Sequence, residues 1–233
     1  MRACILPGLD GTGSLLHEFA HALAPDLQAQ VIAYPTAGAG DYDALTACAA
    51  AQVADHAPCL LIAESFSGPI GIRLAAQSPR QFAGLVLCAS FARTPSGMLP
   101  RPLARVASRL PMDALPMGLV TTMMLGRWST PAWRDRTRAA ISAVDPHTLR
   151  WRLQAALDID VRDTLARIRV PVLYLQASAD RVVSAASARL VCSTLPHTQM
   201  QVVEGPHFLL QAQPQRCATL ITRWLAQDSR AAR

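Results

Sequence analysis

The stretch CLLIAESFSGPIGIRLA, residues 59–75, decides the fold because it joins an apolar run directly to a helical pattern. The apolar run ends at Ser65 and predicts a buried strand, and the small residues from Gly68 onward predict a helix. A serine on a sharp strand-to-helix turn projects its hydroxyl above the sheet, and the next backbone N–H points at the reacting carbonyl oxygen. We therefore interpret Ser65 as a candidate nucleophile. The alternative is an ordinary helix-capping serine.

The residues that flank Ser65 depart from the usual form of such a turn, which is G-x-S-x-G. Small residues are required there because the strand and the helix nearly touch. Ala63 and Ser67 occupy the two glycine positions, and Gly68 follows. Both replacements are small, so the turn remains feasible although the match is incomplete.

Further apolar runs resemble the one before Ser65, at residues 3–8, 30–35, 84–90, 170–178 and 200–205. They are continuous rather than alternating, which is typical of a sheet covered on both faces. Helical patterns occur between several of them, at residues 14–23, 43–55, 68–77, 184–193 and 214–226. This order predicts an α/β fold with a mostly parallel sheet and helices on both faces.

The stretch 93–165 interrupts the alternation, since it holds amphipathic helical patterns and prolines but no strand pattern. We expect a helical cap inserted into a core of residues 1–92 and 166–233, the whole chain 1–233 being one domain. Five of the seven methionines fall in the cap, namely Met98, Met112, Met117, Met123 and Met124. Flexible apolar side chains suit an acyl pocket, and packing of the cap's own core explains them as well.

Two partners for Ser65 follow later strands. A serine hydroxyl needs a base to take its proton, and the base needs a carboxylate to hold one tautomer. Asp180 follows the run at 170–178, and His207 follows the run at 200–205. Singly, Asp180 could cap a loop and His207 could be a surface residue. Because all three side chains follow strands, where α/β sheets place their active sites, we predict a Ser65–His207–Asp180 triad.

A glycine-rich loop, ILPGLDGTG, follows the first predicted strand. Tetrahedral intermediates need N–H donors for their oxyanion. The loop can aim the N–H of Leu9 at the substrate oxygen, opposite the N–H of Phe66. The alternative is an ordinary strand-to-helix turn in which Gly11 and Gly13 supply positive φ angles.

The charge of the chain is unevenly spread. All 22 basic residues are arginine, and the net charge is +6. Residues 93–152 hold ten arginines against three acidic residues, a balance of +7 that leaves −1 for the remainder. An Arg-rich cap could meet an acidic partner such as an acyl carrier protein, or it could be a solvated helical face.

The six cysteines show neither paired metal-ligand spacing nor a disulfide framework. Cys4, Cys59 and Cys88 fall in apolar runs, and we expect buried free thiols in a reducing compartment. The amino terminus enters a strand almost at once, without the pattern of a signal peptide, and no apolar run is long enough for a membrane span. A soluble, cytoplasmic protein is expected.

Taken together, the motifs resemble the α/β-hydrolase superfamily over nearly the whole chain. LPGLDGTG, IAESFSGPIGIRLA, ASADRVV and EGPHFLL match its oxyanion loop, nucleophile turn, acid loop and histidine loop. The resemblance implies five roles: nucleophile for Ser65, general base and acid for His207, orienting acid for Asp180, and oxyanion donors at Leu9 and Phe66.

Two strands that usually open this fold are missing here. The resemblance therefore implies a shortened, all-parallel sheet of six strands in the order 4-3-5-6-7-8 of the family's strand numbering. Among the branches of the superfamily, the chain is most similar to small cytoplasmic carboxylesterases such as pimeloyl-acyl-carrier-protein methyl ester esterases.

The stretch HEFAH, residues 17–21, suggests a different chemistry, because H-E-x-x-H is a zinc-protease signature. Phe19 and Leu23 form the apolar stripe of this helix and must pack on the sheet, so His17 and His21 lie on another face. Pro25 ends the helix early, and no third ligand is evident. We interpret the histidines as a surface pair.

The sequence thus predicts a serine hydrolase that cleaves a carboxylic ester, either a free small molecule or an acyl group carried on a protein. A thioesterase or an acyltransferase would use the same triad. A ligand-binding protein on a hydrolase scaffold is the alternative from another class. No cofactor, metal or nucleic-acid partner is expected.

Overall fold

The computed structural model describes residues 1–38, 40–53, 58–95 and 116–231, with side chains through residue 227. One six-stranded sheet has the order β2-β1-β3-β4-β5-β6, and every neighbouring pair is parallel. The strands are β1 (Arg2–Leu6), β2 (Gln28–Val31), β3 (Cys59–Glu64), β4 (Phe82–Cys88), β5 (Val172–Ala177) and β6 (Thr198–Val203). The predicted α/β-hydrolase fold and its strand order are confirmed.

The central strands are buried on both sides because their side chains alternate between two apolar layers. Cys4 and Leu61 belong to one hydrophobic cluster, and Ile5 and Leu60 belong to the other. All six residues of β3 are buried. Burial of both faces was predicted for every strand and is wrong for the two edge strands, β2 and β6. No residue of β2 is fully buried, and Met200 and other residues of β6 face solvent, because an edge strand has a neighbour on one side only.

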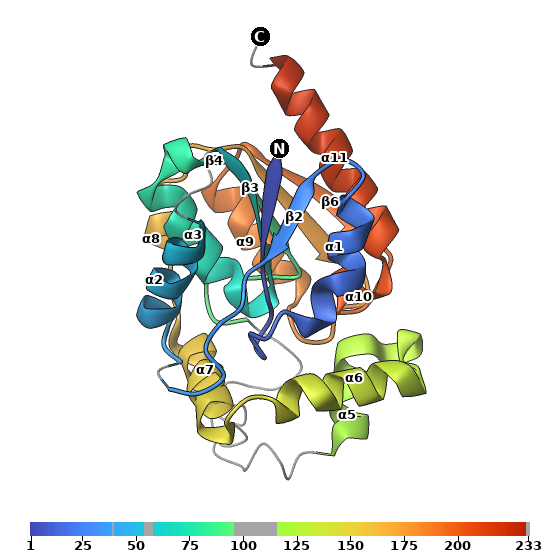
Figure 1. The fold of residues 1–233 in the computed structure, drawn as a ribbon. Coiled ribbons are helices and arrows are strands. Elements are labelled where there is room, and N and C mark those ends of the chain that lie inside the picture. The colour runs from blue at the N-terminus through green and yellow to red at the C-terminus, as the bar shows by residue number, and fades with distance from the viewer. Residues whose placement is uncertain (39, 54–57, 96–115, 232–233) are drawn as a thin grey trace.

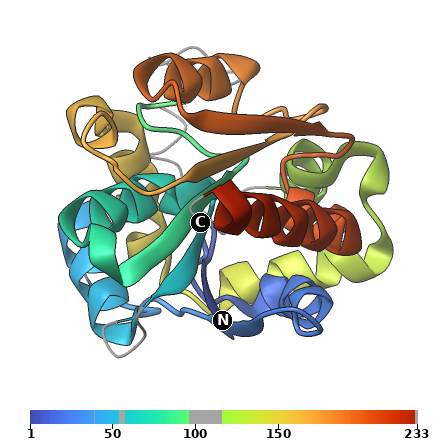
Figure 2. The ribbon, with the colours of Figure 1, turned by 90° about the horizontal axis from the view of Figure 1, so that it is seen from above.

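Helices cover the two faces of the sheet (Figures 1 and 2). One layer holds α2 (Tyr42–Val53), α3 (Gly68–Gln77) and α9 (Ala185–Thr194), and the other holds α1 (His17–Leu23) and α11 (Pro214–Ala231). The short helix α10 (Leu209–Ala212) precedes α11. These helices lie within a few residues of the predicted patterns, and α3 has the predicted bounds.

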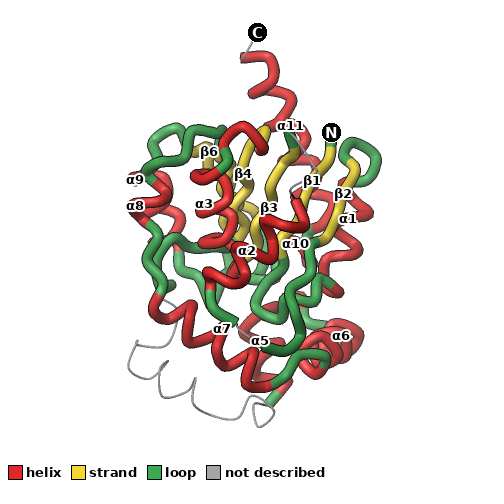
Figure 3. The backbone as a smooth tube through the Cα atoms, turned by 60° about the vertical axis from the view of Figure 1, so that its left-hand side comes forward, coloured by secondary structure: helices red, strands yellow, loops and turns green. Residues whose placement is uncertain are grey.

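The described residues between β4 and β5 form four further helices: α5 (Met117–Leu125), α6 (Pro131–Ser142), α7 (Pro146–Asp158) and α8 (Arg162–Leu165). Polar residues followed by proline begin two of them. The Thr130 side chain accepts the N–H of Trp133 at α6, and Asp145 accepts the N–H groups of His147 and Thr148 at α7. Helices α5, α6 and α7 lie beyond the carboxyl ends of the strands (Figures 1 and 3).

Two of the methionines assigned to the acyl pocket, Met98 and Met112, lie outside the described residues. Met117, Met123 and Met124 are on α5 and are half-buried. The backbone N–H of Phe208 donates to the carbonyl of Met124 at 3.0 Å. Helix α5 therefore lies against the loop that carries His207.

The predicted burial of the strand cysteines is confirmed. Cys4, Cys59 and Cys88 are fully buried, and all six thiols are free. In the part of the chain that the structure describes, no helix is long and apolar enough to cross a membrane.

Gly84 of β4 is a point at which the sheet and the carboxyl-terminal helix nearly touch. A Cβ atom there would lie 2.7 Å from the Trp224 ring of α11 and 3.3 Å from the carbonyl oxygen of Pro171. Trp224 is buried. We predict that Gly84→Ala lowers the free energy of unfolding by about 1–3 kcal/mol, the usual effect of overpacking, as measured by urea denaturation.

Gly118→Ala is the matched control, because in the described structure no atom other than the adjoining residues and the backbone of α5 lies within 4 Å of a Cβ at that position. This change should leave stability unchanged or raise it by up to about 1 kcal/mol through helix propensity. Equal stability of wild type and Gly84→Ala would contradict the described packing of α11.

Candidate active site

Ser65 occupies the sharp turn that the sequence predicted. Strand β3 ends at Glu64, a single 3₁₀ turn covers Ser65–Ser67, and α3 begins at Gly68. The φ angle of Ser65 is 47°, which side-chain-bearing residues seldom adopt. Such strain persists only where the surroundings impose it, and it is characteristic of functional sites.

The glycines that permit the close packing around the turn are Gly68 and Gly71. The two positions where this turn usually has glycine are taken by Ala63 and Ser67. A Cβ at Gly71 would lie 2.8 Å from the Cβ of Ala63, and one at Gly68 would collide with Ser90 Oγ. The turn therefore forms without the two usual glycines, because glycines farther along α3 make the room.

The structure brings Ser65, His207 and Asp180 together in one chain of hydrogen bonds. Ser65 Oγ lies 2.8 Å from His207 Nε2, and His207 Nδ1 lies 3.0 and 2.9 Å from the two carboxylate oxygens of Asp180. A carboxylate can only accept, so Nδ1 carries the proton and Nε2 accepts from the serine hydroxyl. The arrangement can deprotonate Ser65 when its oxygen attacks an electrophile.

Loop geometry fixes both partners. Asp180 follows β5, and its Oδ1 accepts the backbone N–H groups of Val182 and Val183 at 2.8 Å each. His207 lies between β6 and α10 and is only 2% exposed. The imidazole is therefore held in a single orientation and shielded from water.

The Gly-rich loop, residues 7–13, carries Leu9. The Gly8 carbonyl accepts the Gly11 N–H at 3.1 Å, and Gly11 has a φ angle of 72°, which glycine adopts freely. In a trans peptide the N–H points opposite to the C=O, so this bond directs the Leu9 N–H away from Gly11. Among the described residues, no hydrogen bond takes up that N–H. It is free to donate to a ligand.

Phe66, the other predicted oxyanion donor, directly follows Ser65 at the start of the helical segment. Its ring stacks on Tyr42 with centroids 4.8 Å apart, and its carbonyl accepts the Tyr42 hydroxyl at 3.1 Å. These contacts fix the backbone of Phe66 beside Ser65.

Sequence reasoning missed two serines that hold the turn. Ser67 Oγ donates to the carbonyl of Pro7, and the Tyr34 hydroxyl donates to Ser67 Oγ at 2.7 Å. Ser67 thus bonds the turn to the Gly-rich loop, which a glycine could not do. On the other side, Ser90 Oγ donates to the Ser65 carbonyl at 2.6 Å. No motif in the sequence marks Ser90, because its role depends on the β3–β4 pairing.

Arg152 was counted with the charges of the Arg-rich cap, and that assignment is wrong. Its side chain is fully buried, and its guanidinium donates to backbone carbonyls of the Gly-rich loop. Arg127 and Arg136 are exposed but pair with Glu204 and Glu18. Arg101, Arg105 and Arg109 lie outside the described residues.

Glu64 is a buried carboxyl beside Ser65, only 3% exposed. Burial raises its pKa from 4.5 to about 7, against the opposing effects of the Gln211 side chain, His207 and the Gly8 N–H. Its Oε1 atom has no hydrogen-bond partner in the described structure. Glu64 is therefore partly protonated near neutral pH.

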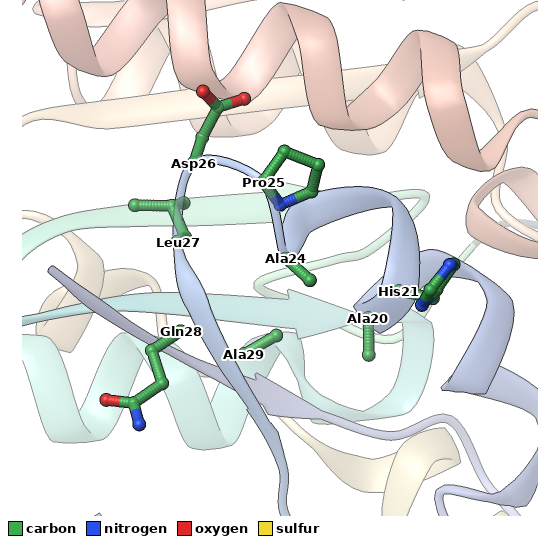
Figure 4. A pocket seen from close by; sticks show the side chains of 8 residues that line it. All are labelled: Ala20, His21, Ala24, Pro25, Asp26, Leu27, Gln28 and Ala29. Carbon is green, nitrogen blue, oxygen red and sulfur yellow. The ribbon is translucent and has the colours of Figure 1, made fainter.

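The HEFAH histidines lie apart from this site. His17 and His21 of α1 are exposed, whereas Phe19 and Leu23 are buried as predicted. A surface hollow of about 510 Å³ includes His21 and lies where α1 leads into β2 (Figure 4). That is the amino end of the sheet, opposite to Ser65. Within the described residues, no group of three or more His, Cys, Asp and Glu side chains could hold a metal ion.

Comparison with known proteins bears on the family and the fold of the chain. The sequence profile of the family described as serine aminopeptidase, S33, matches residues 31–209. Human monoglyceride lipase is 27% identical over 164 residues, which are 66% of this chain and 52% of the lipase. The chain thus spans about half the length of that relative.

A second relative matches over a larger share of its length. The pimeloyl-[acyl-carrier protein] methyl ester esterase of Vibrio parahaemolyticus is 25% identical over 213 residues, 85% of this chain and 83% of the esterase. Among solved structures, a hydrolase from Oleispira antarctica has a TM-score of 0.86 at 14% identity, covering 97% of this chain and 91% of its own. An esterase from Exiguobacterium antarcticum has a TM-score of 0.84 at 13% identity, covering 97% and 92%.

The raised pKa of Glu64 predicts a pH-dependent effect on stability. Between pH 4.5 and about 7 the unfolded chain ionises this carboxyl while the folded chain keeps its proton, so the folded state loses stability as pH rises. The difference corresponds to about 3 kcal/mol. Glu64→Gln removes it, and its free energy of unfolding relative to wild type should therefore rise by this amount from pH 4 to 8.

Urea denaturation at several pH values measures this difference, with the exposed Asp26→Asn as control. The control removes a carboxyl from the surface instead of the interior, and so corrects for the loss of one carboxylate. If the difference in free energy of unfolding between Glu64→Gln and wild type does not change with pH, the pKa of Glu64 is not raised by folding.

Proposed function

The chain belongs to the serine aminopeptidase S33 family of α/β-hydrolases, and we propose that it is a serine esterase that cleaves a carboxylic ester through an acyl-enzyme intermediate. The observation that carries the proposal is the hydrogen-bonded chain from Ser65 through His207 to Asp180. Ser65 acts as nucleophile, His207 as general base and acid, and Asp180 as the group that orients the imidazole.

In the acylation step, Ser65 Oγ attacks the ester carbonyl while His207 Nε2 takes its proton. Asp180 stabilises the imidazolium through the bond to Nδ1. The carbonyl oxygen becomes an oxyanion, which accepts the N–H groups of Leu9 and Phe66. His207 then gives its proton to the leaving alcohol oxygen, the C–O bond breaks, and the acyl group remains on Ser65.

Deacylation repeats these roles with water. His207 takes a proton from the water, whose oxygen attacks the acyl carbonyl. Collapse of the second tetrahedral intermediate releases the acid and returns the proton to Ser65. The two steps use the ester, one water molecule and the chain's own residues.

The names of the relatives favour an ester. A monoglyceride lipase, an enol-lactonase of Acinetobacter baylyi and a pimeloyl-carrier-protein methyl ester esterase all act on a carbonyl bonded to an ester or lactone oxygen. A thioester would meet the same triad, and an alcohol in place of water would make the enzyme an acyltransferase. These remain the nearest enzymatic alternatives.

A non-catalytic ligand-binding protein on this scaffold is the alternative from another class. A receptor needs a pocket but gains nothing from a strained serine bonded to an imidazole that is in turn bonded to a buried carboxylate. The φ angle of 47° at Ser65 and the 2.8 Å bond to His207 therefore favour the enzyme.

We further propose that residues 93–165 form a cap on a core of residues 1–92 and 166–233. Support comes from α5, whose Met124 carbonyl accepts the N–H of Phe208 beside His207. Met117, Met123 and Met124 are half-buried and flexible, so they can adapt to an acyl chain.

The most specific part of the proposal concerns the substrate, which we take to be an acyl group carried on an acidic acyl carrier protein. The basic balance of residues 93–152 supports it, and Arg134 and Arg138 of α6 are exposed. Burial of Arg152 and the ion pairs of Arg127, Arg136 and Arg138, the last with Asp135 at 3.9 Å, reduce the positive surface. A modest effect on the encounter rate is therefore expected, since charges at a rim act mainly through association.

We predict that Ser65→Ala abolishes hydrolysis of p-nitrophenyl esters, with His207→Ala nearly as severe because triad members act as a unit. Asp180→Asn should be less severe if Asp180 only orients the base. Steady-state rates and thermal unfolding measure both effects. Ser193→Ala, an exposed serine of α9 away from the triad, is the comparison. Activity of more than a few per cent in Ser65→Ala would exclude the proposed nucleophile.

A charge prediction tests the carrier-protein step. Replacing Arg134, Arg136 and Arg138 together by glutamine should lower kcat/KM for an acyl-carrier-protein ester several-fold, and leave kcat/KM for a small free ester nearly unchanged. The wild-type preference for the carrier ester should fade as salt rises, because exposed charges are screened over about 8 Å at physiological ionic strength.

The matched control replaces Arg80, Arg189 and Arg216, which are exposed on other parts of the molecule and change the net charge equally. If both triple variants affect the carrier ester equally, or if salt has no effect, the arginines of α6 form only a solvated face.

A further inference from the structure

We propose that Arg152 is a positioning residue that fixes the Gly-rich loop so that the Leu9 N–H faces the reacting carbonyl. The inference rests on the proposed function, because it gives the Leu9 N–H the role of an oxyanion donor. Arg152 in this role connects α7, which lies beyond the carboxyl ends of the strands, to the chemistry at Ser65.

The contacts of Arg152 are with backbone carbonyls. Nη1 donates to the carbonyls of Leu9 at 3.1 Å and Asp10 at 2.6 Å, and Nη2 donates to the carbonyl of Pro35 at 2.7 Å. The side chain is 0% exposed. One guanidinium therefore bonds the Gly-rich loop to the loop that follows β2.

The surroundings of the guanidinium are shaped for it. A Cβ at Gly11 would lie 2.5 Å from Nη1, and one at Gly40 would lie 3.2 Å from Cγ. The Arg152 Cζ atom lies 5.7 Å from the centroid of the Tyr34 ring, a cation–π distance. A planar fork of donors fits two carbonyls on one side and a third on the other, which the point charge of lysine cannot do.

The charge of Arg152 is compensated mainly by dipoles. Burial lowers the pKa of Arg152, and the nearby charge of Asp10 opposes that effect. In the described structure no carboxylate forms an ion pair with the guanidinium. A buried cation is costly unless hydrogen bonds satisfy it. Nε of Arg152 has no hydrogen-bond partner in the described structure, so the cation depends on the three carbonyls that Nη1 and Nη2 reach.

The loop needs such a contact because glycine makes it intrinsically mobile. Two peptide planes flank the α-carbon of Leu9. The plane before it is fixed inside the loop by the bond between the Gly8 carbonyl and the Gly11 N–H. The plane after it contains the Leu9 carbonyl, and among the described residues Arg152 is its hydrogen-bond donor. With both planes fixed, the Leu9 N–H keeps one direction before substrate binds.

A purely structural role is the competing interpretation, in which Arg152 joins α7 to the core and the oxyanion is unaffected. The two roles predict different kinetics. Loss of structure lowers the number of active molecules. Loss of an oxyanion donor lowers kcat of each active molecule and changes KM little, since the oxyanion exists only after attack.

The experiment compares Arg152→Met and Arg152→Lys with the exposed control Arg189→Met. Active sites are counted by complete reaction with a fluorophosphonate, and kcat, KM and the pH profile are measured with a p-nitrophenyl ester. Removing one oxyanion donor typically costs about a hundredfold or more in kcat. Because Arg152 acts through Leu9, Arg152→Met should lower kcat per titrated site by about ten- to a hundredfold.

KM should stay within about threefold and the pH profile should keep its shape, because His207 and Asp180 are untouched. Arg152→Lys should recover part of kcat, and Arg189→Met should match wild type. Wild-type kcat per titrated site in a folded Arg152 variant, or loss of folding in both variants, would overturn the proposal.

The outcome is separable from failure of the proposed function. If wild type is not labelled, or if Ser65→Ala is labelled and active, the serine mechanism itself fails. If wild type is labelled at Ser65 and Arg152→Met turns over normally, only the role of Arg152 fails.

Discussion

The hydrogen bond between Ser65 Oγ and His207 Nε2, 2.8 Å long, is the contact on which the remaining arrangement depends. Its two residues are 142 positions apart in the chain and meet because β3 and β6 run parallel. Carboxyl ends of parallel strands share one edge of the sheet, so the loops after β1, β3, β5 and β6 converge there. The bond also requires Ser65 to hold its strained φ angle of 47°.

Side-chain bonds to backbone carbonyls maintain that strain. Ser90 donates to the carbonyl of Ser65, and Ser67 donates to the carbonyl of Pro7. Each bond ties the turn to a neighbouring strand-end loop. Of the two positions that glycine usually occupies in this turn, position 67 therefore carries a serine with a structural role of its own. Arg152 of α7 forms bonds of the same kind, to the carbonyls of Leu9 and Asp10. Buried polar groups of this kind stay where they are because leaving a partner unbonded is costly.

Sequence patterns predicted the features that depend on residues close to one another in the chain. The central strands follow from apolar runs, and Ser65, Asp180 and His207 follow from their places after those runs. Contacts between distant segments were missed. Arg152 was grouped with the surface charges because helical spacing does not tell which arginine turns inward, and Ser90 carries no motif. Burial of β6 was overestimated because an apolar composition does not reveal an edge strand. The exposure of Met200 and Val202 follows from that position in the sheet.

A trapped acyl-enzyme tests the central claim most directly. A p-nitrophenyl ester with a slowly hydrolysed acyl group would be turned over, the reaction quenched in acid, and the protein digested and analysed by mass spectrometry. The account predicts one acyl adduct, on the peptide that contains Ser65 and on the Ser65 side chain itself. Turnover without an adduct, or an adduct on another residue that tracks the rate of turnover, would contradict it.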